Sequence, residues 1–295
     1  MMQLLREGIE ETVNVEEKRP SVRLSSAHGR ELGEELRRAR HRARMSSEAV
    51  ARAMEWSVGK LSKLESGSRG AGKWDIASLL GRYHVNMVTR ERIMTIAAEL
   101  DTRNFLRLHD RSPDDLAALS VHERHARGIA VYEPLIIPAL AQTEDYAVVM
   151  TGGPNAAAIR MDRQRALRAR RDRETVFYIH EAALGQTVGA PRVMRDQLLH
   201  LTLMATWDKT RVRIVPQTGR FHPTLRGPAT LLTFDSPLPP LAYVETDTDT
   251  VFHDDPWVVG VYQHKMTYLD TVALDAEESR QTLARWARTY ARSAA

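Results

Sequence analysis

Residues 46–67 read SSEAVARAMEWSVGKLSKLESG, and this stretch decides how the first part of the chain folds. A serine stands directly before each of two segments with helical character, residues 48–54 and 58–65, and a serine hydroxyl at that place caps the amino terminus of a helix. Gly67 follows just past the second segment, where helices commonly end. The stretch therefore predicts two short, consecutive helices with a tight turn between them.

Apolar periodicity extends the helical region in both directions. Downstream, it predicts helices over residues 74–83 and 90–101. Residues 26–110 are therefore expected to form an all-α domain, after a loosely ordered acidic tail at residues 1–25. Upstream, an Arg-rich segment carries apolar residues at intervals of three or four positions, namely Leu32, Leu36, Ala39 and Ala43.

The excess of positive charge lies in this same region. The 295 residues include 42 Lys and Arg and 38 Asp and Glu. Residues 21–110 hold 17 of the basic and 11 of the acidic residues, whereas residues 111–295 hold 22 of each. A local excess of this kind is typical of a domain that binds a polyanion such as nucleic acid.

Residues 29–67 resemble the helix-turn-helix of the XRE class of bacterial and phage repressors, which has a lambda-repressor-like fold. The resemblance implies that helix 58–65 enters the major groove of DNA, amino end first. Two positions depart from the class: Glu55 stands where the turn usually has Gly, and Ser47 stands where the second helix usually begins with Gln. We therefore expect a less ideal turn and one weaker phosphate contact. The matching residues are 36–40, 49–54 and 57–67.

The candidate DNA-contacting residues follow from that resemblance. Leu61 and Leu64 would anchor the reading helix, so the side chains between them would face outward. Because Val58 and Gly59 are poor hydrogen-bonding groups, we expect base specificity to rest on the polar residues of the helix and on DNA shape. Basic residues on either side would contact phosphates. The predicted set is Arg42, Arg44, Ser47, Ser57, Val58, Gly59, Lys60, Ser62, Lys63, Arg69 and Lys73.

The second half of the chain has a different pattern. Residues 111–128 are polar and are expected to form a linker or a connecting helix. Residues 129–295 are expected to form a mixed α+β domain, so the chain as a whole is multidomain. Strands are predicted at residues 176–180, 212–215, 230–234 and 241–245, and helices at 192–206, 257–273 and 276–292.

Several segments of this half resemble actinobacterial XRE regulators that have an antitoxin-like carboxy-terminal domain. The resemblance implies a DNA-binding regulator of development or secondary metabolism, whose neighbouring gene often encodes a small partner protein. Residues 139–143 read ALAQT in place of the usual GLLQT, which bears on the choice of partner or ligand. The matching segments are 134–147, 163–167, 180–184, 194–201 and Val215-Pro216.

Two features of the second half each allow two interpretations. A series of arginines between residues 160 and 173 is either a solvated helix face or a second surface for a polyanion or partner protein. The stripe Leu283, Trp286 and Tyr290 on the last predicted helix is either a dimer contact or part of its own domain's core.

Signals for other functions are weak. Residues 67–73 nearly spell a phosphate-binding loop, but Trp74 follows the Lys and a helix precedes the loop. His122 and His125 have a spacing that could hold a metal ion, although solvated histidines are far more common. No Gly-x-Ser-x-Gly nucleophile turn occurs. We therefore expect no enzymatic activity, no cofactor and no metal.

Together these features predict a sequence-specific transcriptional regulator that binds double-stranded DNA as a homodimer. It would read an inverted repeat through residues 57–66. The alternative is an antitoxin-like protein whose carboxy-terminal domain sequesters a small partner protein, with DNA binding as autoregulation. The chain has no Cys, no apolar run of about 18 residues and no signal-peptide pattern. We therefore expect a cytoplasmic, nucleoid-associated protein without a membrane span.

Overall fold

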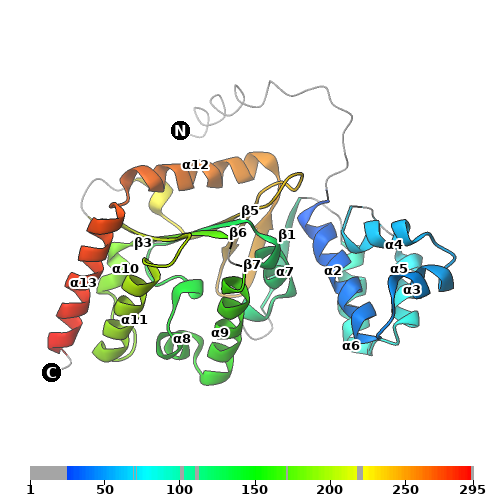
Figure 1. The fold of residues 1–295 in the computed structure, drawn as a ribbon, viewed down its shortest axis with the longest axis horizontal. Helices are drawn as coiled ribbons and strands as arrows, with labels where there is room; N and C mark the ends of the chain where they lie inside the picture. Colours follow the sequence, from blue (N-terminus) through cyan, green and yellow to red (C-terminus); the bar gives the residue numbers. More distant parts are fainter. Residues whose placement is uncertain are drawn as a thin grey trace. The chain divides into compact units, whose positions relative to one another are not determined.

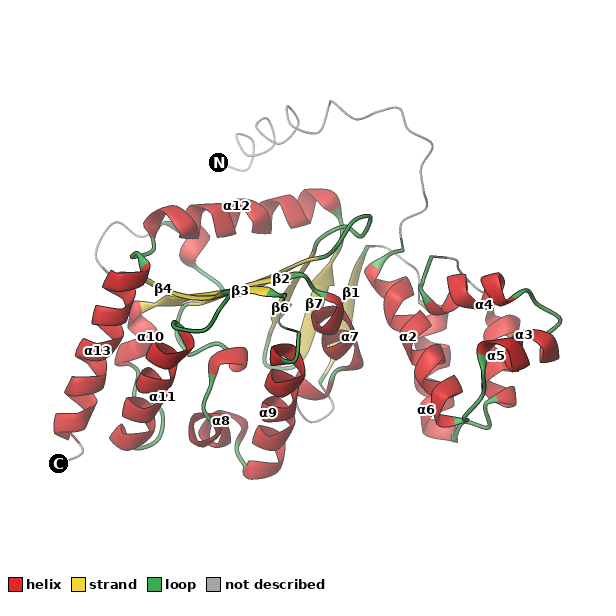
Figure 2. Cartoon of the chain, in the orientation of Figure 1, coloured by secondary structure: helices red, strands yellow, loops and turns green. Residues whose placement is uncertain are grey.

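The computed structural model describes residues 25–68, 70, 72–99, 103–109, 113–170, 172–217 and 222–293 (Figures 1 and 2). The chain divides into two compact units. The first unit holds the described residues up to Phe105, together with Ser236–Pro239 and His253–Gly260. An all-α region followed by an α+β region is confirmed. The predicted tail at residues 1–25 lies, apart from Ser25, outside the described residues.

The first unit is a bundle of short helices with capped amino termini. Ser26, Ser46, Ser57 and Asn86 each accept a hydrogen bond from the first turn of the helix that follows. The core contains Leu36, Val50, Leu61, Ile76 and Ile93, all fully buried. The helices are α2 (Ala27–Arg42), α3 (Ser47–Ala53), α4 (Val58–Glu65), α5 (Lys73–Arg82) and α6 (Met87–Ala98).

The turn between α3 and α4 has the geometry of a left-handed helix end. Glu55 has a φ of 56°. Its N–H donates to the Arg52 carbonyl, and the Trp56 N–H donates to the Ala51 carbonyl at 2.8 Å. A side chain in this conformation costs roughly 1–2 kcal/mol, which a Gly avoids. The expected non-ideal turn is therefore present, and the two backbone hydrogen bonds hold it in place.

Glycines allow α2 to cross the end of α4 at backbone contact. A Cβ on Gly33 would lie 2.6 Å from the Glu65 carbonyl oxygen. A Cβ on Gly67, whose φ is 72°, would lie 2.4 Å from the carbonyl carbon of Gly29. No ordinary side chain fits at such distances. The crossing of these two helices thus depends on hydrogen atoms at positions 29, 33 and 67.

A mixed sheet forms the centre of the second unit. In the described part of the chain its order is β1-β7-β6-β5-β2-β3-β4. β2, β3 and β4 run parallel, and β5 is antiparallel to both β2 and β6. The strands are β1 (Asn104–Leu108), β2 (Gly128–Glu133), β3 (Glu174–His180), β4 (Thr210–Val215), β5 (Ala229–Thr233), β6 (Leu241–Glu245) and β7 (Asp249–His253).

Helices cover both faces of this sheet. α8 (Glu144–Thr151) and α9 (Pro154–Arg168) connect β2 to β3, and α10 (Glu181–Gly185) and α11 (Pro191–Met204) connect β3 to β4. Figure 1 shows these crossover helices on one face and α12 (Pro256–Val272) on the other. α13 (Ala276–Ser293) packs against α11 and β4. No described helix is long and apolar enough to cross a bilayer.

The four predicted strands are present as β3 to β6, and β1, β2 and β7 were not predicted. The segment expected to be a linker or a connecting helix, residues 111–128, contains the helix α7 (Ala117–His125), and the second unit already begins at Leu106. Two of its acidic residues are internal, which its polar composition did not indicate. Asp114 and Glu123 have fully buried side chains, and both pair with arginines of α9.

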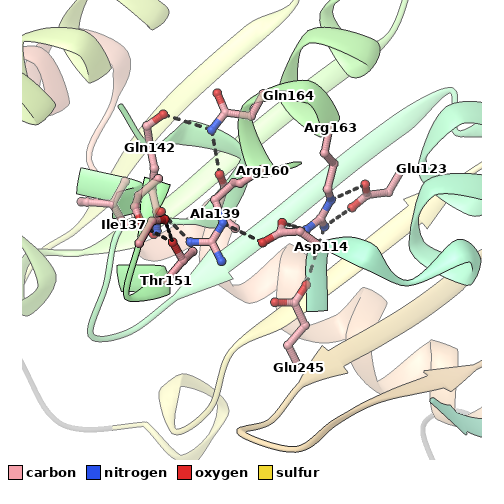
Figure 3. Close-up of polar contacts among 12 residues, drawn as sticks. Asp114, Glu123, Ile137, Ala139, Gln142, Thr151, Arg160, Arg163, Gln164 and Glu245 are labelled. Carbon is pink, nitrogen blue, oxygen red and sulfur yellow. Dashed lines mark hydrogen bonds and ion pairs between the residues drawn. The ribbon is translucent and has the colours of Figure 1, made fainter. Parts of the chain in front are cut away.

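Arg163 is the centre of this buried network (Figure 3). Its guanidinium donates to both carboxylate oxygens of Glu123, at 2.7 and 2.5 Å, and to Asp114 at 2.7 Å. Arg160 donates to the other oxygen of Asp114 at 2.9 Å. Burial opposes ionisation of Asp114, but the two arginines outweigh it and hold its pKa below the usual 3.8. Part of the arginine series is therefore neither a solvated face nor a binding surface.

The same network joins two of the segments that carried the family resemblance. Arg160 also donates to the Gln142 side-chain oxygen at 2.7 Å, and Gln164 donates to the carbonyls of Ala139 and Gln142 (Figure 3). Gln142 in turn donates to the Ile137 carbonyl at 2.8 Å. Residues 134–147 and 163–167 thus act together as an internal support that fixes the loop after β2 on α9.

The apolar stripe of α13 is packed within its own unit. Leu283 is fully buried. The Tyr290 hydroxyl donates to the Leu184 carbonyl at 3.0 Å, and the Trp286 indole N–H donates to Glu181 at 3.2 Å. Of the two interpretations of this stripe, packing on the domain's own core is the one observed.

Replacing Gly33 with Ala should destabilise the first unit by about 1–3 kcal/mol, because the new methyl group overlaps the Glu65 carbonyl. Thermal unfolding monitored by circular dichroism measures this. Gly81→Ala is the matched control: it lies in α5, no atom stands within 4 Å of its Cβ position, and Ala favours a helix by about 1 kcal/mol. An unchanged or raised stability of Gly33→Ala would contradict the close crossing.

Replacing Arg163 with Met should destabilise the second unit by about 3–5 kcal/mol, because it removes the ion-pair partner of the buried Glu123 and one of the two arginines that pair with Asp114. Urea unfolding at pH 7 measures the change. Arg165→Met, on the exposed side of the same helix, should change stability little. The loss should shrink as the pH falls below 3.8, because Asp114 is then protonated in the unfolded chain and, at a lower pH still, in the folded wild type, so the stabilisation that Arg163 gives is lost. Equal effects of the two variants at pH 7 would refute the role of the network.

Candidate nucleic-acid interface

The α3–turn–α4 segment presents one face of α4 to solvent. Leu61 and Leu64 are 0% and 4% exposed and face the core. The Ser57 hydroxyl accepts from the Lys60 N–H at 3.1 Å and begins the helix. On the opposite side the structure exposes the residues expected to face outward, namely Val58, Gly59, Ser62 and Lys63. The predicted division of α4 into an anchoring side and an exposed side is thus present.

A buried ion pair fastens the carboxyl end of α4 to α2. Arg40 donates from two nitrogens to the two carboxylate oxygens of Glu65, at 2.7 and 2.9 Å, and from a third to the Met45 carbonyl at 2.9 Å. The hydrogen bond to Glu65 raises the pKa of Arg40, so the guanidinium stays charged. Burial, followed by the nearby Glu65 carboxylate, raises the pKa of Tyr83 as well. The orientation of α4 is therefore set before any ligand binds.

Lys60 is held by its neighbours. Its ammonium lies 3.3 Å from the Asp75 carboxylate and 3.6 Å from the centre of the Trp56 ring. Its side chain is only 29% exposed. A cation between a carboxylate and an aromatic face is partly neutralised before it meets DNA. Lys60 therefore connects α4 to α5 through its ion pair with Asp75. Its position in the sequence did not indicate this contact.

Lys63 differs from Lys60 in being exposed. No described acidic side chain forms an ion pair with it. Its backbone carbonyl accepts from the Ser66 hydroxyl at 3.1 Å and from the Ser68 hydroxyl at 3.2 Å. These bonds satisfy the end of the helix, while the Lys63 ammonium remains available to a ligand.

The flanking residues of the predicted set lie at helix ends. Arg42 is the last residue of α2, Arg44 follows it in a left-handed turn with a φ of 54°, and Lys73 is the first residue of α5; all three are exposed. Arg69 lies outside the described residues. The predicted contacts thus flank α4 in the chain, before α3 and after α4.

The amino end of α3 carries a negative charge of its own. Ser46 is the capping residue, and Ser47 is the first, half-buried residue of the helix. A hydrogen bond from its own backbone, followed by one from Ser46, lowers the pKa of the exposed Glu48 carboxyl. An ionised carboxylate beside Ser47 repels a phosphate, which agrees with the expectation of a weak contact there.

Trp74 is a residue that the sequence interpretation did not include in the site. It is 87% exposed, which is unusual for Trp. It lies between Lys73 and Asp75, and the Asp75–Lys60 pair places this turn of α5 next to the first turn of α4. The helical periodicity of residues 74–83 does not place Trp74 on the apolar side of the helix. This was the only sequence signal that Trp74 would be exposed.

Comparison with known families gives two matches, one in the amino-terminal part of the chain and one in the remainder. Residues 31–93 match a helix-turn-helix domain, which supports a DNA-binding regulator rather than an enzyme. No curated protein and no solved structure matches the chain. Residues 116–285, more than half of the chain, match a domain of unknown function, DUF5753. This chain therefore belongs to the DUF5753 family and carries an additional helix-turn-helix domain at its amino-terminal side.

Proposed function

We propose that this protein is a sequence-specific transcriptional regulator of the XRE type that reads DNA through α4. The observation that carries the proposal is the exposed face of α4, held on a buried Arg40–Glu65 pair and a glycine crossing. A preformed helix of this kind meets the major groove without a cost for ordering. A regulator of this kind acts on chromosomal DNA in the cytoplasm.

Within α4, the reading roles divide by exposure. Lys63 is the main candidate for a hydrogen bond to guanine, and Ser62 for an adaptable polar contact. Val58 is 42% exposed and suits a thymine methyl group, which needs no hydrogen bond. Lys60 acts indirectly, by fixing the first turn of the helix. Outside α4, the predicted phosphate contacts are Arg42, Arg44, Ser47, Ser57, Arg69 and Lys73.

The working form is a homodimer on an inverted repeat. One α4 covers only a few base pairs, which is too short a site for selection in a genome. Two copies on one face of the duplex read half-sites about 34–36 Å apart. Because the stripe of α13 is buried in its own unit, the dimer contact must use another surface.

A second candidate function is capture of a small partner protein by the second unit, with DNA binding as autoregulation. Leu199 and Leu203 favour it: they lie one turn apart on α11 and are 52% and 57% exposed. DNA affinity measured with and without the product of the neighbouring gene separates the two functions. A partner that binds the second unit and changes DNA affinity supports the antitoxin-like alternative.

Lys63→Ala should weaken operator binding by about 1–3 kcal/mol and relax the preference at one base position. Fluorescence anisotropy on the operator, once genome-wide mapping has identified it, and on a scrambled duplex measures both effects. Arg288→Ala is the control, since it removes one exposed positive charge from the second unit. If Lys63→Ala bound with wild-type affinity and footprint, α4 would not be the reading helix.

Changing the spacing of the operator tests the dimer. An insertion of about 5 bp between half-sites turns one of them to the opposite face of the duplex. We expect affinity to fall to that of a single half-site, and an insertion of about 10 bp to restore part of it. If a 5 bp insertion left the affinity unchanged, the half-sites would be bound independently. The proposed dimer would then be wrong.

A further inference from the structure

The second unit contains a cavity of about 510 Å³ that DNA binding does not use. It lies between the amino-terminal halves of the parallel strands β2, β3 and β4 and the carboxyl ends of α9 and α11. Ile129, Phe177 and Met204 line it and are each less than 5% exposed. A cavity of this size with an apolar lining is typical of a small-molecule site.

Arg168 and Trp207 form a polar wall of the cavity. The guanidinium carbon of Arg168 lies 5.3 Å from the centre of the Trp207 ring. The Arg168 guanidinium also donates to the side-chain oxygen of Gln164 at 3.2 Å. Asp208 also lines the cavity, but no described acidic side chain forms an ion pair with Arg168. The wall therefore presents a cation that is oriented but not neutralised.

The other two arginines at the cavity already have hydrogen-bond or ion-pair partners. Arg173 donates to four backbone carbonyls, at the carboxyl ends of α7 and α9. Arg170 pairs with Asp172 and Asp235. Arg168 donates from Nε to the Gln164 carbonyl at 3.4 Å, a long hydrogen bond within the last turn of α9.

The local electrostatics agree with an excess of positive charge. Burial, followed by the neighbouring Arg165, lowers the pKa of Arg168. Burial, followed by Arg168 itself, lowers the pKa of His200, whose ring lies 5.9 Å from Trp207. Arginine remains charged even so. An anion next to Arg168 would relieve the repulsion that these groups share.

We propose that this cavity binds a small amphipathic organic anion. Its apolar ring or chain occupies the space beside Phe177 and Met204, and its carboxylate or sulfonate forms an ion pair with Arg168. Trp207 stacks on the cation from the other side and fixes its position. The site uses residues of the second unit alone, so this proposal can be tested independently of DNA reading by α4.

A matched pair of fluorescent probes tests the site in the full-length protein. 1-Anilinonaphthalene-8-sulfonate has an aromatic body and a sulfonate, and N-phenyl-1-naphthylamine has the same body without the charge. We expect one saturable site for the sulfonate, with affinity about tenfold higher than for the neutral probe, as a charge-assisted hydrogen bond provides. Arg168→Gln should abolish that preference while leaving the neutral probe's affinity nearly unchanged.

Three control variants locate the binding. Arg165→Gln, on the same helix but outside the cavity, should keep the preference. Leu203→Ser should have no effect, because Leu203 belongs to an exposed patch and not to the cavity. Thr175→Trp fills the cavity and should block both probes; Leu167→Trp serves the same purpose if Thr175→Trp does not fold.

Two results would overturn the proposal. One is a preference for the sulfonate that survives Arg168→Gln, since the anion would then bind elsewhere. The other is binding that does not saturate or that Leu203→Ser removes, since the probe would then report exposed apolar surface. Decanoate should displace the sulfonate from the wild-type protein, whereas decanol should displace it at least several-fold less well. Failure of decanoate to compete would exclude carboxylates as the ligand class and leave sulfonate-like anions.

Discussion

The backbone contact between α2 and the end of α4 is the constraint on which the first unit depends. Gly33 and Gly67 bring the two backbones to distances at which a Cβ would overlap a carbonyl group. At that separation Arg40 reaches Glu65 and both can be buried, because the third nitrogen of the guanidinium donates to the Met45 carbonyl. The exposed face of α4 is a consequence: Leu61 and Leu64 are drawn inward, and Ser62 and Lys63 are left outside.

The second unit uses buried charge in a comparable way but for a different purpose. Arg163, Asp114 and Glu123 would be unstable in an apolar interior one at a time, and they are tolerated because each satisfies the others. The network also fixes the segment after β2 through Gln142. The segment after the interior strand β2 is thereby attached to α9, and Arg168 of the same helix lines the apolar cavity. Arginines of one series thus have three separate roles: internal support, helix capping and the wall of a cavity.

These two arrangements explain why the two units suit different ligands. The first unit presents a preformed helix, with the exposed basic residues Arg42, Arg44 and Lys73 before and after it, and a polyanion with a regular groove is the ligand that such a surface fits. Residues 111–295 hold as many basic as acidic residues, so the selectivity that we propose for the second unit comes from an apolar cavity and one oriented cation.

Sequence alone was sufficient for the helices of the first unit and for the inward and outward sides of α4. Those features depend on caps, on periodicity and on single residues such as Gly67, which act within one or two turns of chain. It also predicted β3 to β6, because each is a short apolar run bounded by turn residues. The less ideal turn at Glu55 was expected for the same local reason, and its φ of 56° agrees.

Tertiary structure alone decided the roles of the charged residues. Lys60 and Lys63 look alike in sequence. In the structure Lys60 contacts the Trp56 ring and pairs with Asp75, whereas Lys63 makes neither contact. Asp114 and Glu123 lie in a segment whose polar composition predicts a linker or a connecting helix, but arginines 40 or more positions away in the chain pair with them in the interior. The apolar stripe with Leu283 and Tyr290 would look the same in sequence whether a second copy or the same unit covered it. Only the structure shows that the same unit does. The physical reason is common to these cases: whether a charge is solvated, paired or capped depends on partners distant in the chain, and local pattern carries no information about them.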